Sequence, residues 1–136
     1  MLVAGLSQRD LDPFPVLDCD YHIDAGDSAV RALLSQSQIP GVIFCGNDLS
    51  AMGAMNALER ADVRIPEDVS VIGIDDIGFA FLARPPLTTI RVPRERLGVV
   101  AFQALEKMLK LKRQKGAEYY LETELVVRKS SAQAPR

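Results

Sequence analysis

The 136-residue sequence predicts an α/β fold in which a parallel sheet is flanked by helices. Residues 41–45 and 69–74 are continuous apolar runs, which are typical of strands buried on both faces. Between and after these runs, apolar residues recur every three or four positions, as in amphipathic helices. Alternating strands and helices favour a parallel sheet. Hydrophobic residues make up 48% and charged residues 25% of the chain, a globular composition that excludes a disordered polypeptide.

The first half of the chain contains two predicted strand–helix units. Residues 15–20 form a predicted strand, and residues 25–36 form a helix that Asp24 can cap. Residues 41–45 form the second strand. Residues 48–61 form the second helix, because leucine and methionine recur there every three residues.

The second half continues this alternation and adds a long helix. A double proline at 85–86 ends a short helical segment, because proline lacks the amide donor and disfavours helix in the residue before it. The predicted elements are a strand at 69–74, a short helix at 77–83, a strand at 87–92, a helix at 94–111 and a last strand at 119–127.

Charge and cysteine content exclude several classes of function. The formal net charge is −2, whereas a domain that binds nucleic acid by itself usually has a basic face. The charge therefore argues against such a domain. Cys19 and Cys45 form neither a disulfide framework nor a zinc set, and His22 has no partner at metal-ligand spacing. No secretory signal, membrane-spanning run or phosphate-binding glycine motif is present. We therefore expect a cytoplasmic protein without a metal or cofactor.

Polar or aromatic residues follow three of the predicted strands at their carboxyl ends, where open parallel sheets bind ligands. They are Tyr21, Asn47 and Asp75. An aromatic face, an amide and a carboxylate together suit a polyhydroxylated or heterocyclic small molecule. Two simpler interpretations remain open: Asn47 and Asp48 can serve only as helix caps, and Asp75 and Asp76 can be ordinary turn residues.

Catalysis is not predicted. Asp75 and Asp76 are adjacent and leave the strand in different directions, whereas a carboxylate pair that acts on one bond must flank it. Cys45 ends an apolar run far in sequence from the single histidine, so we interpret it as a buried, inert thiol.

Two apolar segments are candidate interfaces. The first widens the apolar stripe of the helix at 48–61, as in a helix at a dimer seam. The second places aromatic and leucine side chains in one short turn, where any exposed remainder implies a partner. The predicted interface residues are Ala51, Met52, Met55, Phe79, Phe81 and Leu82.

Four motifs resemble the lactose- and galactose-repressor family of bacterial transcription regulators. Residues 39–58, IPGVIFCGNDLSAMGAMNAL, resemble the family's strand–helix unit, and residues 64–76, RIPEDVSVIGIDD, resemble its next strand and acidic turn. The sequence PPLTTI at 85–90 resembles its crossover, and LVVR at 125–128 resembles its closing strand. The motifs follow the family's order and spacing over residues 20–131.

This resemblance implies an effector-binding domain built like a periplasmic sugar-binding protein, with a ligand cleft between two α/β subdomains. Residues 7–92 and 117–131 resemble the C-terminal subdomain. Residues 93–116 resemble a return helix that packs on the N-terminal subdomain, which is mostly missing from residues 1–136. We therefore expect a partial domain whose return helix exposes its apolar face or buries it against another copy.

The resemblance also implies roles for particular residues. By position, Asp75 matches the effector-binding aspartate, Asn47 an amide that hydrogen-bonds a sugar, and Tyr21 an aromatic that stacks on the effector. Residues 51–55 and 79–84 match the dimerisation helices.

The implied function is the effector-sensing and dimerisation part of a bacterial DNA-binding transcriptional repressor. Its effector would be a sugar or nucleoside-like metabolite, and DNA would be bound only through an N-terminal helix-turn-helix that is absent here. Half a cleft predicts weak or no effector binding by this chain alone. The alternative is a sugar-binding protein of a transport system, which shares the fold.

Overall fold

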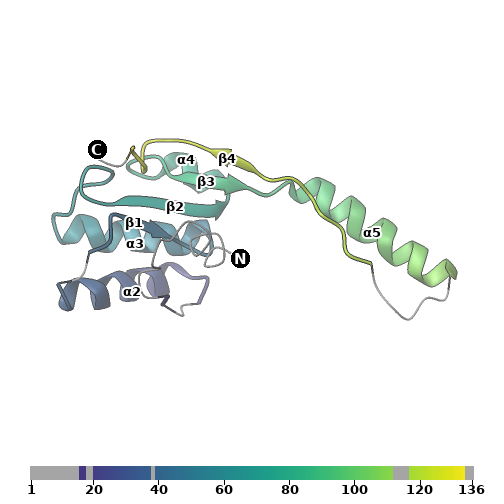
Figure 1. The fold of residues 1–136 in the computed structure, drawn as a ribbon, viewed down its shortest axis with the longest axis horizontal. Helices are drawn as coiled ribbons and strands as arrows, with labels where there is room; N and C mark the ends of the chain where they lie inside the picture. The colour runs from purple at the N-terminus through teal and green to yellow at the C-terminus, as the bar shows by residue number, and fades with distance from the viewer. Residues whose placement is uncertain (1–15, 18–19, 38, 112–116, 134–136) are drawn as a thin grey trace, which may run out of the picture.

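The computed structural model describes residues 16–17, 20–37, 39–111 and 117–133. Figure 1 shows a sheet with helices packed on it and one helix that projects away as an arm. No helix in these ranges is long and apolar enough to cross a membrane. The elements are α2 (Ile23–Ser35), β1 (Val42–Phe44), α3 (Asp48–Arg60), β2 (Ser70–Asp75), α4 (Gly78–Leu82), β3 (Thr88–Arg91), α5 (Arg94–Leu111) and β4 (Glu124–Val126).

The four strands form one sheet in the order β1-β2-β3-β4. The first three are parallel, with Phe44 opposite Ile72 and Ile74 opposite Ile90. The last strand is antiparallel to β3 and pairs Leu125 with Ile90. The predicted α/β class with a parallel sheet is therefore confirmed, and the chain leaves the sheet through β3 and returns beside it through β4.

Most predicted boundaries agree with the structure within two residues, and α5 coincides with its prediction. The strand expected at 119–127 is an exception, because only Glu124–Val126 lies opposite the short β3 and can share its hydrogen bonds. The strand expected at 15–20 falls largely outside the described residues. Asp24 is not the N-cap of α2: the helix begins one residue earlier, at Ile23, and Asp24 lies in its first turn.

The core lies between α3 and the sheet. The buried face of α3 is built mainly from alanines, with Leu58 at its far end, and it packs against Val69, Val71 and Leu87 of the sheet region. Small side chains allow the helix to approach the strands closely. This packing fixes the start of α3, and therefore Asn47, relative to the end of β2.

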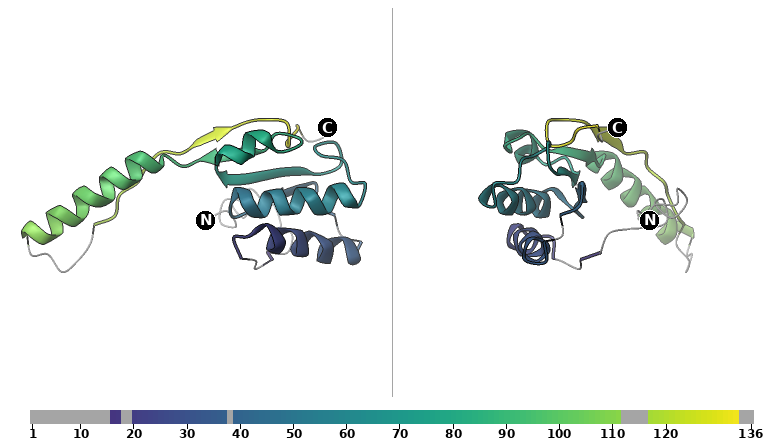
Figure 2. Two further views of the ribbon diagram at one scale, coloured as in Figure 1. Left: turned by 180° about the vertical axis from the view of Figure 1, so that it is seen from behind. Right: turned by 60° about the vertical axis from the view of Figure 1, so that its left-hand side comes forward.

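Two glycines bring α2 into close contact with α3, as both views of Figure 2 show. A Cβ atom built on Gly26 would lie 2.0 Å from the carbonyl oxygen of Ser50, and one on Gly53 would lie 1.9 Å from that of Ile23. The two backbones therefore touch directly. Across the same pair of helices, Arg60 forms an ion pair with Asp27. The close packing of α2 on α3 also fixes the start of α2, and therefore Tyr21, which lies just before it.

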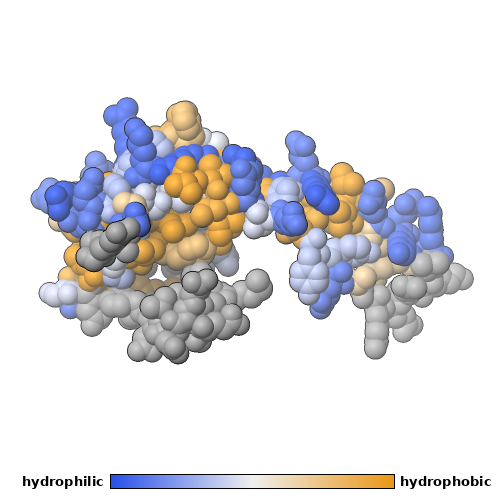
Figure 3. Space-filling view, turned by 45° about the horizontal axis from the view of Figure 1, so that its top comes forward, coloured by the Kyte–Doolittle hydropathy of each residue, from blue (hydrophilic) through white to orange (hydrophobic). Residues whose placement is uncertain are grey.

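The projecting helix α5 has no described neighbour that covers its apolar side. In Figure 3, hydrophobic side chains are visible both on the body of the chain and along this arm. Within the described part of the chain, the large apolar residues of α5 that are exposed are Leu97, Val99, Phe102, Leu105 and Leu109. The assignment of α5 to a partner subdomain stays a prediction.

Replacing Gly53 by alanine tests the close helix contact. We expect Gly53→Ala to lower the free energy of unfolding by about 1–3 kcal/mol, because the new methyl group overlaps the backbone of α2. Gly98→Ala in α5 is the matched control, since nothing lies within 4 Å of its added Cβ. Urea unfolding of the two variants and the unmodified chain measures this effect. Equal midpoints for Gly53→Ala and the unmodified chain would contradict the predicted loss of stability.

Candidate functional site

Tyr21 and Asn47, two of the three predicted binding residues, lie side by side at one edge of the sheet. The Asn47 Nδ2 atom donates a hydrogen bond to the Tyr21 carbonyl oxygen, at 3.0 Å. The Tyr21 ring lies over Gly46, where an added Cβ would approach Cε1 to 2.9 Å. Tyr21 as a whole is nevertheless 67% exposed, which leaves aromatic surface accessible to a ligand.

Asn47 caps α3, as the simpler interpretation of the sequence predicted. Its Oδ1 accepts hydrogen bonds from the backbone amide and the hydroxyl of Ser50, at 2.9 and 2.7 Å. Because the amide nitrogen also bonds Tyr21, only one Asn47 N–H remains for any other group. The effector-binding role of Asn47 stays a prediction.

The third predicted binding residue, Asp75, ends β2 in a strained turn. Asp75 has φ 113° and Asp76 has φ 52°. Residues other than glycine rarely adopt positive φ angles of this kind. Each such residue costs about 1–3 kcal/mol and persists only where its surroundings hold it. Parallel pairing of β1 with β2 brings this turn to the same edge as Asn47.

The two aspartates of the turn have opposite environments. Among the described residues, none forms a hydrogen bond or ion pair with the Asp75 carboxylate. The Asp76 carboxylate is nearly buried and accepts from Arg91 Nε at 2.7 Å and from Arg128 at 2.5 Å. Burial acts to raise the pKa of Asp76, but the hydrogen bonds from both arginines outweigh it and hold the pKa below 3.8.

A buried carboxylate, Asp48, joins this turn to α3 and β3. Its Oδ1 accepts from the Thr89 hydroxyl at 2.5 Å, and its Oδ2 accepts from the Ile77 amide at 2.8 Å. Burial raises the pKa of Asp48 above 3.8, although both hydrogen bonds act against this. Gly73 is required beside it, because a Cβ there would lie 2.3 Å from Asp48 Oδ1.

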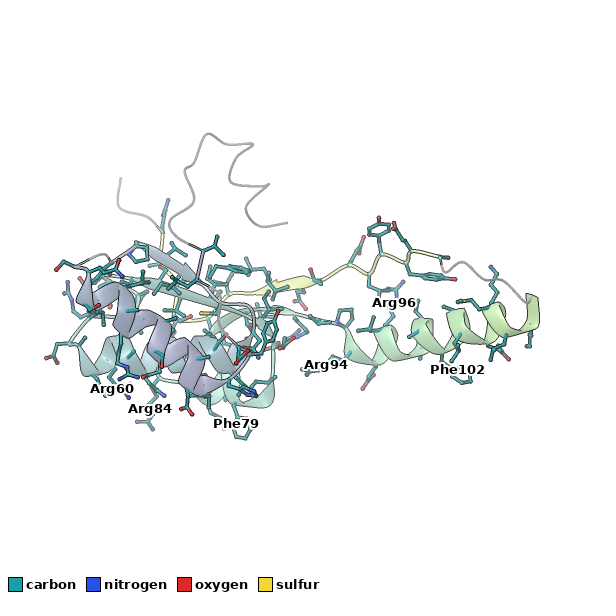
Figure 4. The ribbon with its side chains drawn as sticks, turned by 90° about the horizontal axis from the view of Figure 1, so that it is seen from below. Arg60, Phe79, Arg84, Arg94, Arg96 and Phe102 are labelled. Atoms are coloured by element: carbon teal, nitrogen blue, oxygen red, sulfur yellow. The ribbon has the colours of Figure 1, made fainter. Side chains whose placement is uncertain are left out.

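Arg94 supports the turn from the start of α5. Its guanidinium donates to the carbonyl oxygens of Asp75 and Asp76, at 3.2 and 3.3 Å. Figure 4 shows Arg94 at the junction between the sheet and the arm. Arg91 and Arg94 are thus intramolecular partners of the turn.

This arrangement is suited to binding. It combines an open aromatic face, one amide donor and a carboxylate without a described partner, which together can bind a hydroxyl-bearing molecule. In the described ranges, no group of three or more histidine, cysteine or acidic side chains could hold a metal ion. His22 is the N-cap residue of α2.

The predicted dimer interface is partly wrong. Ala51 and Met55 are 0% and 4% exposed, because this face of α3 forms the core of the single chain. They are therefore not available to a partner. Met52 is half-buried, whereas Phe79, Phe81 and Leu82 of α4 are exposed. Only these four residues remain as a predicted interface.

Sequence reasoning missed the residues that hold the site. Asp48 was interpreted only as a helix cap, and its buried partner Thr89 lies 41 residues away. Arg128 entered the sequence analysis only as the last residue of the motif at 125–128, without a role of its own. A long-range ion pair between Asp76 and Arg128 follows from strand order, which periodicity alone does not give.

Residues 6–131 match the family described as periplasmic binding protein-like domain. The HTH-type transcriptional repressor PurR of Edwardsiella ictaluri is 38% identical over 135 residues, which are 98% of this chain and 40% of that protein. The PurR of Photobacterium profundum is 38% identical over 115 residues, or 85% of this chain and 34% of the relative. The chain thus spans about 40% or less of these curated relatives.

Solved structures agree with the sequence comparison. The transcriptional regulator CelR in its cellobiose complex superimposes with a TM-score of 0.86 and 30% identity, covering 95% of this chain and 40% of that one. The Lac repressor bound to ONPG gives a TM-score of 0.88 and 28% identity, covering 96% and 39%. The resemblance predicted from the sequence is confirmed.

The lowered pKa of Asp76 predicts how acid affects stability. In the folded chain this group stays ionised below its unfolded value of 3.8. Its contribution is therefore fully present above pH 3.8 and is lost as the pH falls through the lower folded pKa. We expect Asp76→Asn to be less stable than the unmodified chain near neutral pH and to converge with it in acid. Chemical unfolding at a series of pH values measures this, and a constant difference would contradict it.

Proposed function

We propose, from the fact that this chain belongs to the periplasmic binding protein-like domain family, that it is the effector-sensing and dimerisation part of a bacterial transcriptional repressor. The relatives at 38% identity are named as repressors, and the structural neighbours named above are regulators. These names favour a repressor over the sugar-binding protein of a transport system. A repressor acts at DNA, so the proposed location is the cytoplasm, and the proposal includes no catalysis.

The observation that supports this proposal is that two neighbouring carboxylates differ in their hydrogen-bond and ion-pair partners. Asp76 is paired with two arginines, whereas Asp75, held in a strained conformation, has no described partner. Strain of this kind concentrates at ligand sites. We propose that Asp75 accepts hydrogen bonds from effector hydroxyl or ring N–H groups, that Asn47 donates one, and that Tyr21 stacks on the effector.

The proposed effector is a sugar or a nucleoside-like metabolite. Cellobiose appears with CelR, and ONPG appears with the Lac repressor, in two of the structural neighbours. Both kinds of ligand present donors to a carboxylate. In a repressor, effector binding would bias two arrangements of the subdomains, and a DNA-binding head would report that bias.

Substitution of Asp75 tests the binding role. The test protein is a chimera in which residues 1–136 replace the matching segment of the Edwardsiella ictaluri relative, which supplies the other part of the cleft. We expect calorimetric titration with D-galactose, cellobiose, adenosine and guanine to identify one binding probe. Asp75→Asn should weaken that probe at least about tenfold, since hydrogen bonds to charged groups contribute about 1.5–3 kcal/mol.

The control for this titration is Asp62→Asn. Asp62 is exposed, lies just beyond the far end of α3 and also has a positive φ, of 57°. It should leave the affinity unchanged. An equal affinity of the Asp75→Asn chimera and its parent would show that Asp75 is not a binding residue, and failure of every probe would remove the proposed effector classes.

The proposed dimer uses α4 and the adjoining side of α3. Phe79 and Leu82 are 62% and 65% exposed, which is unusual for large apolar side chains on a short, confined segment. We propose that these residues, with Met52 and Phe81, pack against the same surface of a second copy. Such self-complementary contact is typical of two-fold dimers.

Charge placed in this surface should give monomers. We expect Met52→Glu combined with Leu82→Glu to abolish dimers in sedimentation equilibrium, because burying the new carboxylates without partners is unfavourable. Phe102→Glu on α5 is the matched control, because Phe102 is 69% exposed but lies on the arm, away from Phe79 (Figure 4). A dimer that persists in the double variant would exclude this interface.

A further inference from the structure

The turn at the end of β2 is held mainly through the side chain of Asp76. Arg91 reaches this carboxylate from β3, and Arg128 reaches it from the segment after β4. One cation therefore comes from β3, by which the chain leaves the sheet, and the other from the segment that follows the returning strand β4. The Asp76 carboxylate therefore links the end of β2 to both of these segments.

Both arginines are themselves fixed. Arg128 also donates to the carbonyl oxygen of Leu87 at 2.7 Å, and its side chain is largely buried. Arg91 also pairs with Glu124 of β4 at 2.8 Å. Arginine donors arranged in this way hold a carboxylate in direction as well as in position.

The backbone of the turn has weaker support. The Asp76 amide donates to the Thr89 hydroxyl over a long 3.4 Å, and Arg94 bonds the two carbonyl oxygens at 3.2 and 3.3 Å from an exposed position. Since both aspartates have positive φ, a change at Asp76 alters the backbone angles that set the direction of the Asp75 carboxylate. The strong contacts at this turn are the charge-assisted bonds of Asp76 and, just beyond it, the bond from the Ile77 amide to the Asp48 carboxylate at 2.8 Å.

We propose that Asp76 is a positioning residue for the Asp75 carboxylate, and that Arg91 and Arg128 couple the direction of this carboxylate to the crossing strands β3 and β4. The proposal rests on the proposed function, in which Asp75 contacts the effector. In this proposal Asp76 acts through Asp75 and not on the ligand, because both of its carboxylate oxygens already accept from the arginines. Displacement of β3 against β4 would redirect Asp75, and a ligand held by Asp75 would favour one arrangement of the two strands.

The test compares Asp76→Asn with Asp68→Asn in the 136-residue chain by nuclear magnetic resonance. Asp68 is a matched control, because it also pairs with an arginine, Arg64, but on the opposite side of β2 in sequence and away from the site. Asparagine tolerates positive φ, so backbone preference alone does not release the turn. The readouts are amide exchange of Ile77, the backbone coupling constants of Asp75 and Asp76, and the carboxyl carbon shift of Asp75.

We expect Asp76→Asn to speed exchange at Ile77 by about tenfold or more relative to the core amide of Val71, because a turn that has lost the charge-assisted contacts of Asp76 releases the neighbouring Ile77 amide from Asp48 more often. The coupling constants of Asp75 should move toward averaged values, and Asp68→Asn should change neither. Arg91→Gln, which leaves Arg128 in place, should give an intermediate change and replaces Asp76→Asn if that variant does not fold. Exchange at Ile77 that rises only in step with Val71, with unchanged couplings, would overturn the proposal.

Binding separates this proposal from the proposed function. The same substitution in the chimera should weaken the identified probe although Asp75 is intact, and Asp68→Asn should not. If no probe binds the chimera, the proposed function fails while the resonance experiment still decides the positioning role. If the probe binds equally well to the Asp76→Asn chimera, the positioning role is wrong and the proposed function stands.

Discussion

One edge of the sheet, which carries Asn47 and the turn at 75–76, depends on the contacts of the buried Asp48 carboxylate. It ties the first turn of α3 to the hydroxyl of Thr89 in β3 and to the amide of Ile77 beyond β2. Leaving such a buried donor without its partner costs about 1–3 kcal/mol, so both segments are held where Asp48 puts them. The helix start is a favourable place for this charge, because the amide dipoles of α3 point toward it. This contact therefore fixes the position of Asn47 relative to the turn at 75–76.

Three neighbouring aspartates therefore have three different environments at this edge of the sheet. Asp48 is buried and joins elements, Asp76 is paired with arginines and holds a strained turn, and Asp75, the proposed binding residue, lacks a described partner. Their environments, and not their residue type, separate these roles, as the opposite pKa shifts of Asp48 and Asp76 show. The strained backbone is stabilised by contacts that come from four different segments of the chain. A site built in this way combines an accessible carboxylate with a rigid support.

The sequence predicted the elements and the edge at which the site lies, because both follow from local periodicity and from the rule for parallel strands. The helix at 94–111 was predicted to the residue, since its apolar spacing is regular and a glycine follows it. The tasks of Asp48 and Arg128 were not predicted, because their partners lie 41 and 52 residues away and become neighbours only through strand order. Ala51 and Met55 were misassigned for a related reason: an apolar stripe shows that a helix is covered, but not whether its own chain or another one covers it.

The capping contacts of Asn47 also determine which chemical groups can approach it. A free carboxamide can offer either an oxygen or a nitrogen to a ligand, since rotation by half a turn exchanges them. Here Ser50 holds the oxygen twice and the Tyr21 carbonyl holds one hydrogen of the nitrogen, so the amide cannot rotate without losing all three bonds. Any molecule that reaches Asn47 meets a hydrogen-bond donor of fixed direction. Asp75, in contrast, presents only acceptors when ionised. The edge of the sheet therefore has a fixed polarity, and a molecule bound as proposed would place an acceptor at Asn47 and a donor at Asp75.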